Sequence, residues 1–372
     1  MRSSRLSRGM LIIGLIGLAL CDVGALIDRQ QLFVSYLFAY LFWNGLSQGG
    51  MAILMLHQLT GGGWGYAIHR PLLAMTKALP VVALLFIPIG FGLHYLYLWA
   101  QPEVVAHDPI LQRKTWYLNA PFFLTRAAAY FIIQMTLAFT LTRWLAADRA
   151  FSRRLQRLSA GGLVLYALIV TFAAFDWIMS LTPHWYSTTF GLLIGVGQML
   201  GAFAFAIATA VLVRGRLTET LSPHHLHDLG NLLLMFILSW AYLAFMQYLI
   251  IWFENLPHEI SWYISHALTS WQGLGLFIIV FQLALPFVVL LSRRAKRDAA
   301  ILGSLAATIV LAHGANVFWL VAPTFRPNGF RILWIDLAAF IGIGGIWLAV
   351  FLTQLSAIPT VSSVAHEVTQ HG

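Results

Sequence analysis

The stretch AGGLVLYALIVTFAAFDWIMSL, residues 160–181, contains a single charged side chain, that of Asp176, and it decides the fold. A helix rises about 1.5 Å per residue, so these residues would extend about 33 Å and cross a hydrocarbon core of about 30 Å. Since backbone polar groups cannot stay unpaired in lipid, we expect this segment to be a membrane-spanning helix.

Similar apolar segments fill the rest of the chain. Of its 372 residues, 60% are hydrophobic and 9% are charged, whereas a soluble domain has about 25% charged residues. Most of the protein surface must therefore face lipid, and we expect no soluble domain within the chain. Hydropathy indicates about ten spans, near residues 10–27, 32–57, 72–99, 120–142, 160–181, 187–212, 229–253, 262–291, 300–321 and 331–355.

The expected fold is all-α, because these segments are far longer than the strands of an outer-membrane barrel. No small-residue cleavage site follows the first segment, so we interpret it as a retained helix and not as a signal peptide. Breaks at an Arg-rich joint and a His-rich turn suggest two four-helix bundles plus two further helices. The expected parts are a peripheral first helix (1–31), a first core part with spans two to four (32–158), a second core part with spans five to eight (159–298), and the last two spans with a cytoplasmic tail (299–372).

Basic residues are divided unevenly between the loops. With the N-terminus inside, the inner segments hold fifteen Lys and Arg residues and the outer segments hold five. The positive-inside rule therefore places both termini in the cytoplasm. The formal charge of +9 is a topology signal, and nothing in it indicates nucleic-acid binding. The single cysteine, Cys21, excludes a disulfide or a cysteine-ligated cluster built from this chain alone.

Ionisable side chains inside spans are costly and tend to mark a pathway. They fall into two layers joined by a band of neutral polar groups, which resembles two water-accessible vestibules. The expected outer proton-handling site comprises Asp176, His94, Arg126, Glu254 and His266. The expected inner vestibule comprises His57, Lys77, His227 and Asp228, and the middle polar relay Tyr130, Gln134 and Gln198.

The spacing of polar residues in the fourth span indicates which face of this helix points into the protein. Asn119, Arg126, Tyr130 and Gln134 are spaced by seven, four and four residues and therefore share one helical stripe. Arg126 lies about 9 Å below the outer end of its helix, and Asp176 about 8 Å below the end of its own. The equal depths predict an ion pair that lowers the cost of burying both charges.

Several interpretations of the outer cluster stay open. Asp176, Arg126 and His94 could simply hold helices together. They could instead handle the protons of a quinol, with Trp177, Trp185 and Tyr186 at the entrance. For Trp185 and Tyr186 we favour the alternative of an interfacial aromatic belt.

Metal and haem sites find weaker support in the sequence. His57, His94, His266 and His313 are the candidate haem ligands, but they occupy different depths and no span carries two histidines about four turns apart. The histidines at 224, 225 and 227 could hold a metal, but a solvated helix start, with Ser222 as its cap and Pro223 at the first helical position, is the simpler explanation. We therefore expect no metal site. In the third span, Pro80 and Pro88 predict kinks that place His94 beyond a bend.

Four segments resemble the smaller of the two NrfD-type, polysulfide-reductase-like membrane proteins of bacterial alternative complex III. They are ALPVVALLFIPIGFGLHYLYLWA (78–100), KTWYLNAPFFLTRAAAYF (114–131), FDWIMSLTPHWYST (175–188) and HDLGNLLLMFILSWAYLAFMQYLIIWFENLPHE (227–259). The resemblance covers roughly residues 30–300. It implies ten helices around two four-helix bundles in the bacterial cytoplasmic membrane, and no covalently bound cofactor.

The same resemblance implies the partners. They are the larger NrfD-like paralogue, an iron-sulfur protein and c-type cytochromes, with lipid around the membrane subunits. Haem c and iron-sulfur clusters therefore belong to other chains. In this family quinol oxidation is usually assigned to the larger paralogue, and the smaller one is discussed as a proton path and for a quinone-proximal site. Lys77 occupies a position where an inner proton path would more readily use an acidic residue.

Our working hypothesis is a membrane subunit of a quinol:electron-acceptor oxidoreductase, not catalytic alone, with polar half-channels from both faces. The alternative is a structural scaffold for the paralogue and the haem and iron-sulfur proteins. A free-standing secondary transporter is a third interpretation, against which the lack of a clear inverted repeat counts.

Overall fold

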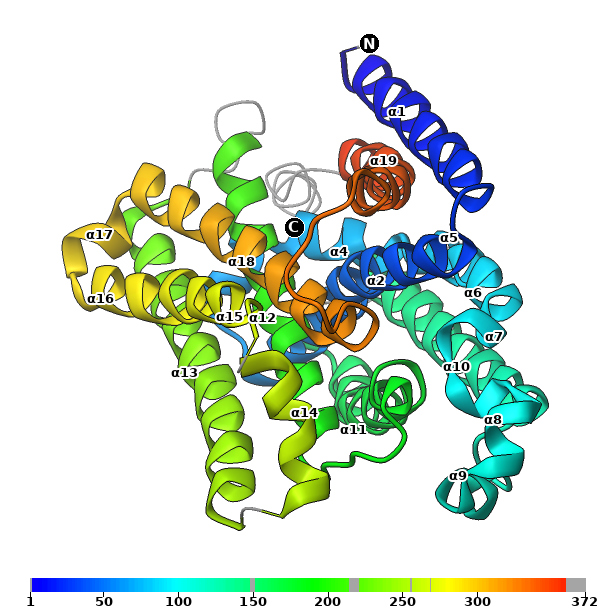
Figure 1. The fold of residues 1–372 in the computed structure, drawn as a ribbon. Coiled ribbons are helices and arrows are strands. Elements are labelled where there is room, and N and C mark those ends of the chain that lie inside the picture. Colours follow the sequence, from blue (N-terminus) through cyan, green and yellow to red (C-terminus); the bar gives the residue numbers. More distant parts are fainter. Residues whose placement is uncertain (1, 148–150, 214–220, 255, 268, 359–372) are drawn as a thin grey trace.

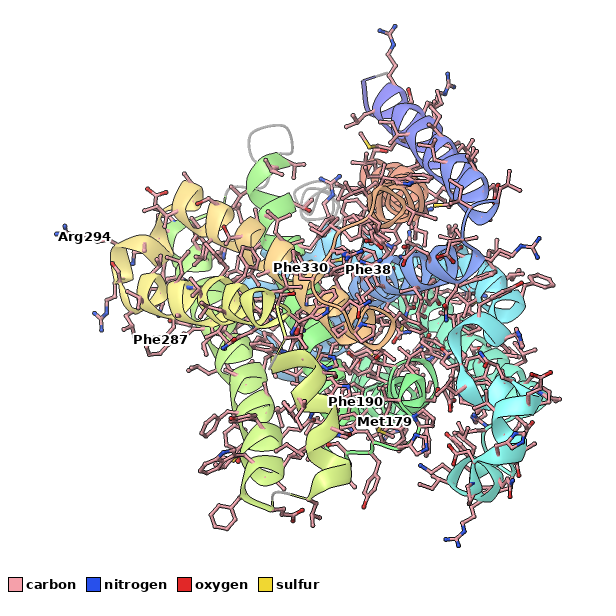
Figure 2. All side chains as sticks on the ribbon, viewed as in Figure 1. Phe38, Met179, Phe190, Phe287, Arg294 and Phe330 are labelled. Carbon is pink, nitrogen blue, oxygen red and sulfur yellow. The ribbon has the colours of Figure 1, made fainter. Side chains whose placement is uncertain are left out.

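A computed structural model describes residues 2–147, 151–213, 221–254, 256–267 and 269–358 (Figure 1). Arg149, Arg214 and Arg216 of the charge count lie outside these ranges. Every regular element in the described ranges is helical. Nine of these helices are long and apolar enough to cross a membrane, and large hydrophobic side chains cover the outside of the molecule (Figure 2). The chain is thus an all-α, multi-pass membrane protein.

The candidate spans agree closely with the expected ones. They are Ser4–Ala25 in α1 (Arg2–Ala25), His69–Phe91 in α4 to α6, α10 (Ala120–Ala147), Arg153–Leu181 in α11 (Arg153–Trp177) and η2 (Met179–Leu181), α12 (Phe190–Val213), α13 (Pro223–Glu254), Gln272–Leu291 in α15 to α16, α18 (Ala299–Phe325) and α19 (Trp334–Ala357).

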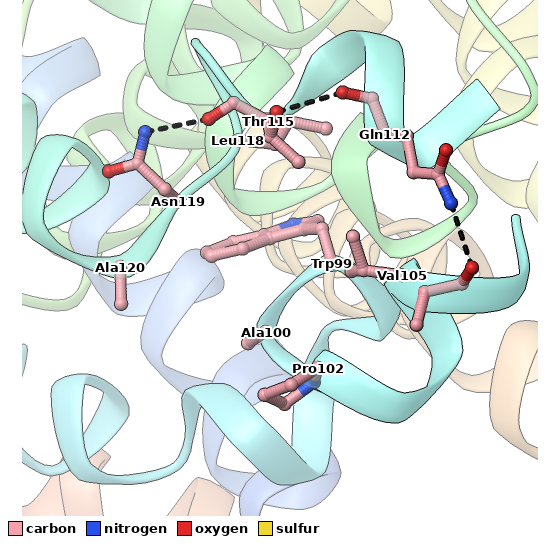
Figure 3. Close-up of a pocket in the computed structure, with 10 residues that line it drawn as sticks. Trp99, Ala100, Pro102, Val105, Gln112, Thr115, Leu118, Asn119 and Ala120 are labelled. Atoms are coloured by element: carbon pink, nitrogen blue, oxygen red, sulfur yellow. Dashed lines mark hydrogen bonds between the residues drawn. The ribbon is translucent and has the colours of Figure 1, made fainter. Parts of the chain in front are cut away.

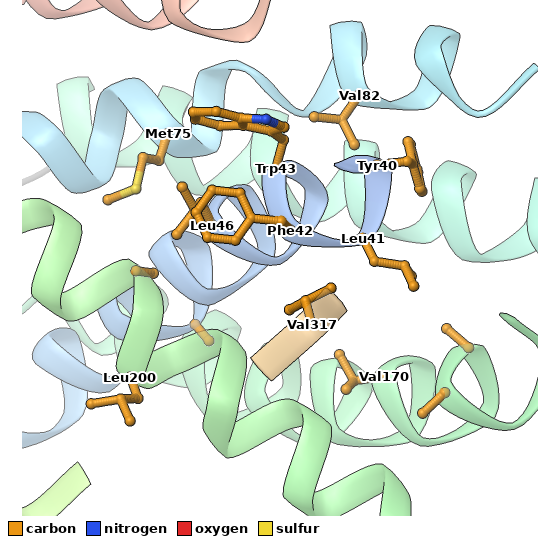
Figure 4. Close-up of a cluster of buried hydrophobic side chains, with 14 of the residues drawn as sticks. Tyr40, Leu41, Phe42, Trp43, Leu46, Met75, Val82, Val170, Leu200 and Val317 are labelled. Carbon is orange, nitrogen blue, oxygen red and sulfur yellow. The ribbon is translucent and has the colours of Figure 1, made fainter. Parts of the chain in front are cut away.

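Helix α2 (Arg29–Thr60) is the tenth long helix and occupies the centre of the molecule. It is buried without interruption from Val34 to Met55 and contacts α4, α11, α12, α18 and α19. Large side chains such as Trp43 and Leu46 fill the space around it (Figure 4). Because protein surrounds α2, its polar residues can face other helices, and it needs less apolar sequence than a lipid-facing span.

Most of the first helix is exposed, and its main neighbour is α19. It packs on α19 through glycines: a Cβ at Gly17 would lie 2.6 Å from the Cα of Gly342, and a Cβ at Gly345 would lie 2.6 Å from the Cα of Gly14. Small residues let membrane helices approach closely enough for their backbones to touch.

The third span is broken where its prolines predict. It consists of α4 (His69–Lys77), α5 (Leu79–Leu85), α6 (Ile87–Phe91) and α7 (Leu93–Leu96). Pro80 and Pro88 lie in the first turns of α5 and α6, because proline has no N–H to bond the turn before it.

The expected eighth span, 262–291, is wrong as a single helix. A short helix, α14 (Pro257–Ala267), ends before a turn at residues 269–271. The span itself comprises α15 (Gln272–Ile278), a π-helical segment η3 (Ile279–Ala284) and α16 (Leu285–Leu291). The indole N–H of Trp271 donates to the Arg326 carbonyl oxygen at 3.1 Å, which anchors the turn inside the protein.

Short helices make the connections. The outer segment after α7 forms η1 (Leu98–Ala100), α8 (Pro102–His107) and α9 (Pro109–Lys114), whereas α3 (Gly63–Ala67) and α17 (Arg293–Arg297) join helices at the other end.

Candidate functional site

The core of the candidate site is a buried ion pair between α10 and α11. The Arg126 guanidinium donates to both carboxylate oxygens of Asp176, from Nε at 2.9 Å and from Nη2 at 2.8 Å. Asp176 is fully buried and Arg126 is 9% exposed. The pair predicted from equal helix depths is therefore present.

Every side of this pair is occupied by protein. The Tyr130 hydroxyl donates to Asp176 Oδ2 at 2.8 Å, and Arg126 Nη1 donates to the Tyr117 carbonyl oxygen at 2.9 Å. The guanidinium carbon lies 3.9 Å from the Tyr117 ring centre and 4.3 Å from that of Phe122, close enough for cation–π attraction. Burial, and then the negative charge of Asp176, raise the pKa of Tyr117 to about 12.

The end of α11 is fixed by hydrogen bonds to its last carbonyl groups. The Ser180 hydroxyl donates to the Asp176 carbonyl oxygen at 2.5 Å, and the Tyr97 hydroxyl donates to that of Trp177 at 3.1 Å. Helix ends leave such carbonyls without intrahelical partners. These two bonds therefore hold the Asp176 backbone at a defined depth.

The expected aromatic belt is wrong for Trp185 and stays a prediction for Tyr186. Tyr186 is 52% exposed, as a belt residue would be, but Trp185 is only 3% exposed. Its ring stacks on Trp262 at 4.8 Å, so it belongs to the interior. Trp177 is also buried and packs edge-to-face against Tyr40 at 6.1 Å.

A stripe of neutral polar groups continues from the pair into the middle of the molecule. Gln134 lies one turn below Tyr130 on α10, and its Oε1 accepts from Gln48 Nε2 of α2 at 3.3 Å. Gln48 Nε2 also donates to Asn44 Oδ1 at 3.0 Å. Tyr40, Asn44 and Gln48 are four residues apart and share one face of α2.

Four buried atoms of this stripe have no partner among the described residues. They are Tyr40 Oη, Asn44 Nδ2, Gln48 Oε1 and Gln134 Nε2. Buried polar groups in folded proteins are almost always hydrogen-bonded to protein or to ordered water. These four atoms lie on or beside the hydrogen-bonded amides of α2 and α10, where bound water would satisfy them.

Gln198, the third expected relay residue, lies on α12 and packs against a different face of α2. Its Oε1 accepts from the Tyr166 hydroxyl at 3.2 Å, and its side chain packs against Gly45. The described contacts link Gln198 to Tyr166 and not to Gln134, so the expected relay separates into two parts.

The structure does not bring the other outer residues to Asp176. His94 is exposed because Leu93 and Leu96 turn inward on the short helix α7 and leave it on the outer face. Glu254 is exposed at the end of α13. Neither contacts Asp176 in the described part of the chain, so the described contacts do not join them to the ion pair.

His266 is buried in an aromatic cluster formed by segments other than those that carry the ion pair. It stacks on Trp262 at 3.9 Å and meets Trp319 edge-on at 4.7 Å. Its Nδ1 lies 2.6 Å from the Trp262 carbonyl oxygen. This cluster joins α14 to α18, and the contacts of His266 are with it and not with Asp176.

The residues of the expected inner vestibule contact different partners. His57 is buried and its Nε2 lies 3.0 Å from the Gly62 carbonyl oxygen. His227 Nδ1 lies 3.0 Å from Asn231 Nδ2, and Asp228 contacts His224 at 3.3 Å. Lys77 is exposed at the end of α4, and its place in a vestibule stays a prediction.

A second buried ion pair, missed by the sequence analysis, joins α18 and α19. Arg326 Nη2 donates to Asp336 Oδ1 at 2.7 Å, and the Ser35 hydroxyl donates to the same oxygen at 2.6 Å. The backbone N–H of Leu333 donates to Asp336 Oδ2. The sequence carries one signal for it, an acid three residues after a helix start, which is a capping position; Arg326 follows the apolar span and has the pattern of an ordinary loop charge.

An outer cavity of about 440 Å³ lies beside α8, α9 and the start of α10 (Figure 3). Trp99 forms its base and stacks on Tyr97 at 4.9 Å. The cavity is lined by this extramembrane segment and does not include Asp176.

Comparison with known proteins adds no family: no protein-family model and no curated protein matches the chain. Within the described residues, no group of three or more His, Cys, Asp and Glu side chains is arranged to hold a metal ion. The site is therefore defined by its geometry, an ion pair at one end of a neutral polar stripe.

Proposed function

We propose that this protein is a membrane subunit of a quinol:electron-acceptor oxidoreductase of the alternative complex III type, and that it carries protons. The proposal includes a bacterial cytoplasmic membrane, two four-helix bundles and both termini in the cytoplasm. Quinol chemistry, iron-sulfur clusters and haem c belong in this scheme to the partner proteins. The four segments that resemble the smaller NrfD-type protein of that complex support the assignment.

The single observation that carries the proton role is the α2/α10 stripe. It begins at Asp176 and Tyr130 and continues to Gln134 and Gln48, with four unpartnered polar atoms along it among the described residues. Uncharged amide and hydroxyl groups with bound water conduct a proton without leaving a fixed charge in the low-dielectric middle of the membrane.

The ion pair would act as the outer gate of this path. A proton that Tyr130 passes to Asp176 Oδ2 is replaced on the Tyr130 hydroxyl by one from the stripe. Protonation neutralises Asp176 and leaves Arg126 without its counter-charge, which is costly in a buried site. The guanidinium therefore drives release of the proton toward the outer face and restores the pair.

The test uses the intact complex purified through a tag on this chain. Gln48→Leu and Gln134→Leu remove the amides of the stripe, and we expect the number of protons released per quinol oxidised to fall in both variants. Gln282→Leu is the matched control, because Gln282 is also fully buried but lies in η3, which contacts α13 and α18. Unchanged proton release in the stripe variants, with normal assembly, would exclude the proton path.

Membership of the complex has its own test. The tagged chain isolated from native membranes should bring with it an NrfD-like paralogue, an iron-sulfur protein and c-type cytochromes, identified by mass spectrometry and haem absorbance. Isolation of the chain alone under mild detergent would favour a free-standing transporter.

One observation favours the scaffold alternative for the outer cluster. Arg126 is enclosed by Asp176, Tyr117 and Phe122, as a helix-joining pair would be. Asp176→Asn separates the two functions. If the pair is a proton gate, the complex should assemble normally but release fewer protons per quinol. If the pair is a scaffold, less complex should assemble, and the complexes that form should release the normal number of protons per quinol.

A further inference from the structure

An open groove of about 640 Å³ lies on the membrane face of the molecule between α12 and α13. It extends along α13 from Asn231 to Leu243 and is closed on its other side by Leu192 and Val196 of α12. Twelve residues of helix correspond to about 18 Å, close to the depth of one leaflet of a hydrocarbon core of about 30 Å.

The groove begins at the N-terminal end of the long apolar run of α13. Residues 232–252 contain no charged side chain, and Asn231 comes directly before them. The polar and charged turn of α13, with its histidines and Asp228, precedes Asn231. Asn231 therefore lies at the level where hydrocarbon gives way to lipid headgroups.

A buried lysine meets the groove at this level. Lys296 is only 8% exposed, and its Nζ donates to Asn231 Oδ1 at 2.7 Å. Its aliphatic stem packs on α13 at Gly230, where a Cβ would lie 2.8 Å from Lys296 Cγ. The ammonium group is thus held against Asn231, the residue that lines the groove at this end.

This ammonium lacks a counter-charge in the described part of the chain. No carboxylate there lies within ion-pair distance of Lys296, and Asp228 contacts His224 instead. Burial, and then the neighbouring Arg293, lower the pKa of Lys296. Arg293, Arg294 and Arg297 of the same helix are exposed and add positive charge around the mouth.

We propose that this groove binds one anionic phospholipid of the leaflet on the α17 side, with its phosphate at Lys296 and Asn231 and one acyl chain between α12 and α13. A phosphate supplies the negative charge that Lys296 lacks, through a charge-assisted hydrogen bond. Basic sites between membrane helices select anionic headgroups in this way. The proposal stands independently of the proton role.

Native mass spectrometry of the full chain in detergent micelles measures the affinity directly. Phosphatidylglycerol, cardiolipin and phosphatidylcholine with the same acyl chains are the probes. Loss of one charge-assisted hydrogen bond corresponds to at least about a tenfold loss of affinity. We expect Lys296→Met, which keeps the packed stem, to lose this much for both anionic lipids and clearly less for phosphatidylcholine, because its choline group offsets the charge of its phosphate.

Three further variants separate the contribution of the lipid headgroup from that of the acyl chain. Lys296→Arg keeps the charge and should keep selectivity, and Arg294→Met, on the same helix but pointing away from the protein (Figure 2), should stay within about twofold, since exposed charges contribute little. Ser239→Phe fills the groove and should weaken all three lipids equally. Equal binding of anionic and neutral lipids by the natural chain, or a partner helix seated in the groove of the complex, would overturn the proposal.

Discussion

Removing one partner of the Arg126–Asp176 pair should destabilise the protein far more than removing both. Arg126→Met keeps the length of the side chain but deletes two hydrogen bonds to Asp176 and one to the Tyr117 carbonyl oxygen. It leaves a fully buried carboxylate that retains only Tyr130 as a side-chain donor among the described residues. Breaking a buried pair in this way costs about 3–5 kcal/mol.

The matched change is the double variant Arg126→Met, Asp176→Leu. It removes both charges together, and replacement of a buried pair by apolar residues of similar volume is often close to neutral. We therefore expect the two single changes to be non-additive, with a coupling free energy of about 3 kcal/mol.

Thermal unfolding of the purified protein in one detergent, followed by tryptophan fluorescence, measures this coupling. A change of 1 kcal/mol shifts the midpoint by about 2 °C in a protein of this size, so the single variants should unfold about 6–10 °C lower. The double variant should recover most of that shift. Additive shifts in the double variant would refute the reasoning, because they would mean that Asp176 and Arg126 do not interact.

The remaining predictions concern packing, exposure and pH. Gly342→Leu should release α1 from α19, because a side chain there meets the backbone at Gly17; crosslinking between the two helices should be lost while the core stays folded. Lys77→Gln should change the unfolding midpoint by no more than about 1 °C, because an exposed charge contributes little. Burial opposes ionisation of Asp108, but backbone N–H donors and then His184 at 2.7 Å outweigh it and lower the pKa of Asp108. That contribution is present at pH above the ordinary carboxyl value of about 4 and disappears as pH falls through the lowered pKa. Protection of residues 182–189 from hydrogen exchange, measured relative to the intrinsic rate at each pH, should therefore fall only in acid, and Asp108→Asn should lose this pH dependence.

The features that could be predicted from the sequence depend on helix length, depth and spacing. Apolar runs located the spans, and proline positions located the breaks in the third one. Arg126 and Asp176 could be paired because each lies at a countable distance from the end of a regular helix. Such arguments require no knowledge of which helices are neighbours beyond the immediate sequence.

The predictions that failed depend on tertiary packing. His94 follows three breaks in the helix, so its direction could not be inferred from a continuous 3.6-residue period. His266 is surrounded by tryptophans from other segments, and only the fold brings them together. Arg326 and Asp336 flank a turn whose geometry decides whether they meet, and that geometry cannot be measured from residue spacing.

The hydrated stripe between α2 and α10 is the central claim, and an experimental structure of the intact complex at a resolution that shows water tests it directly. We predict ordered waters within hydrogen-bond distance of Tyr40 Oη, Asn44 Nδ2, Gln48 Oε1 and Gln134 Nε2, continuing toward Tyr130. A dry interface, in which apolar side chains separate these groups from one another, would contradict it.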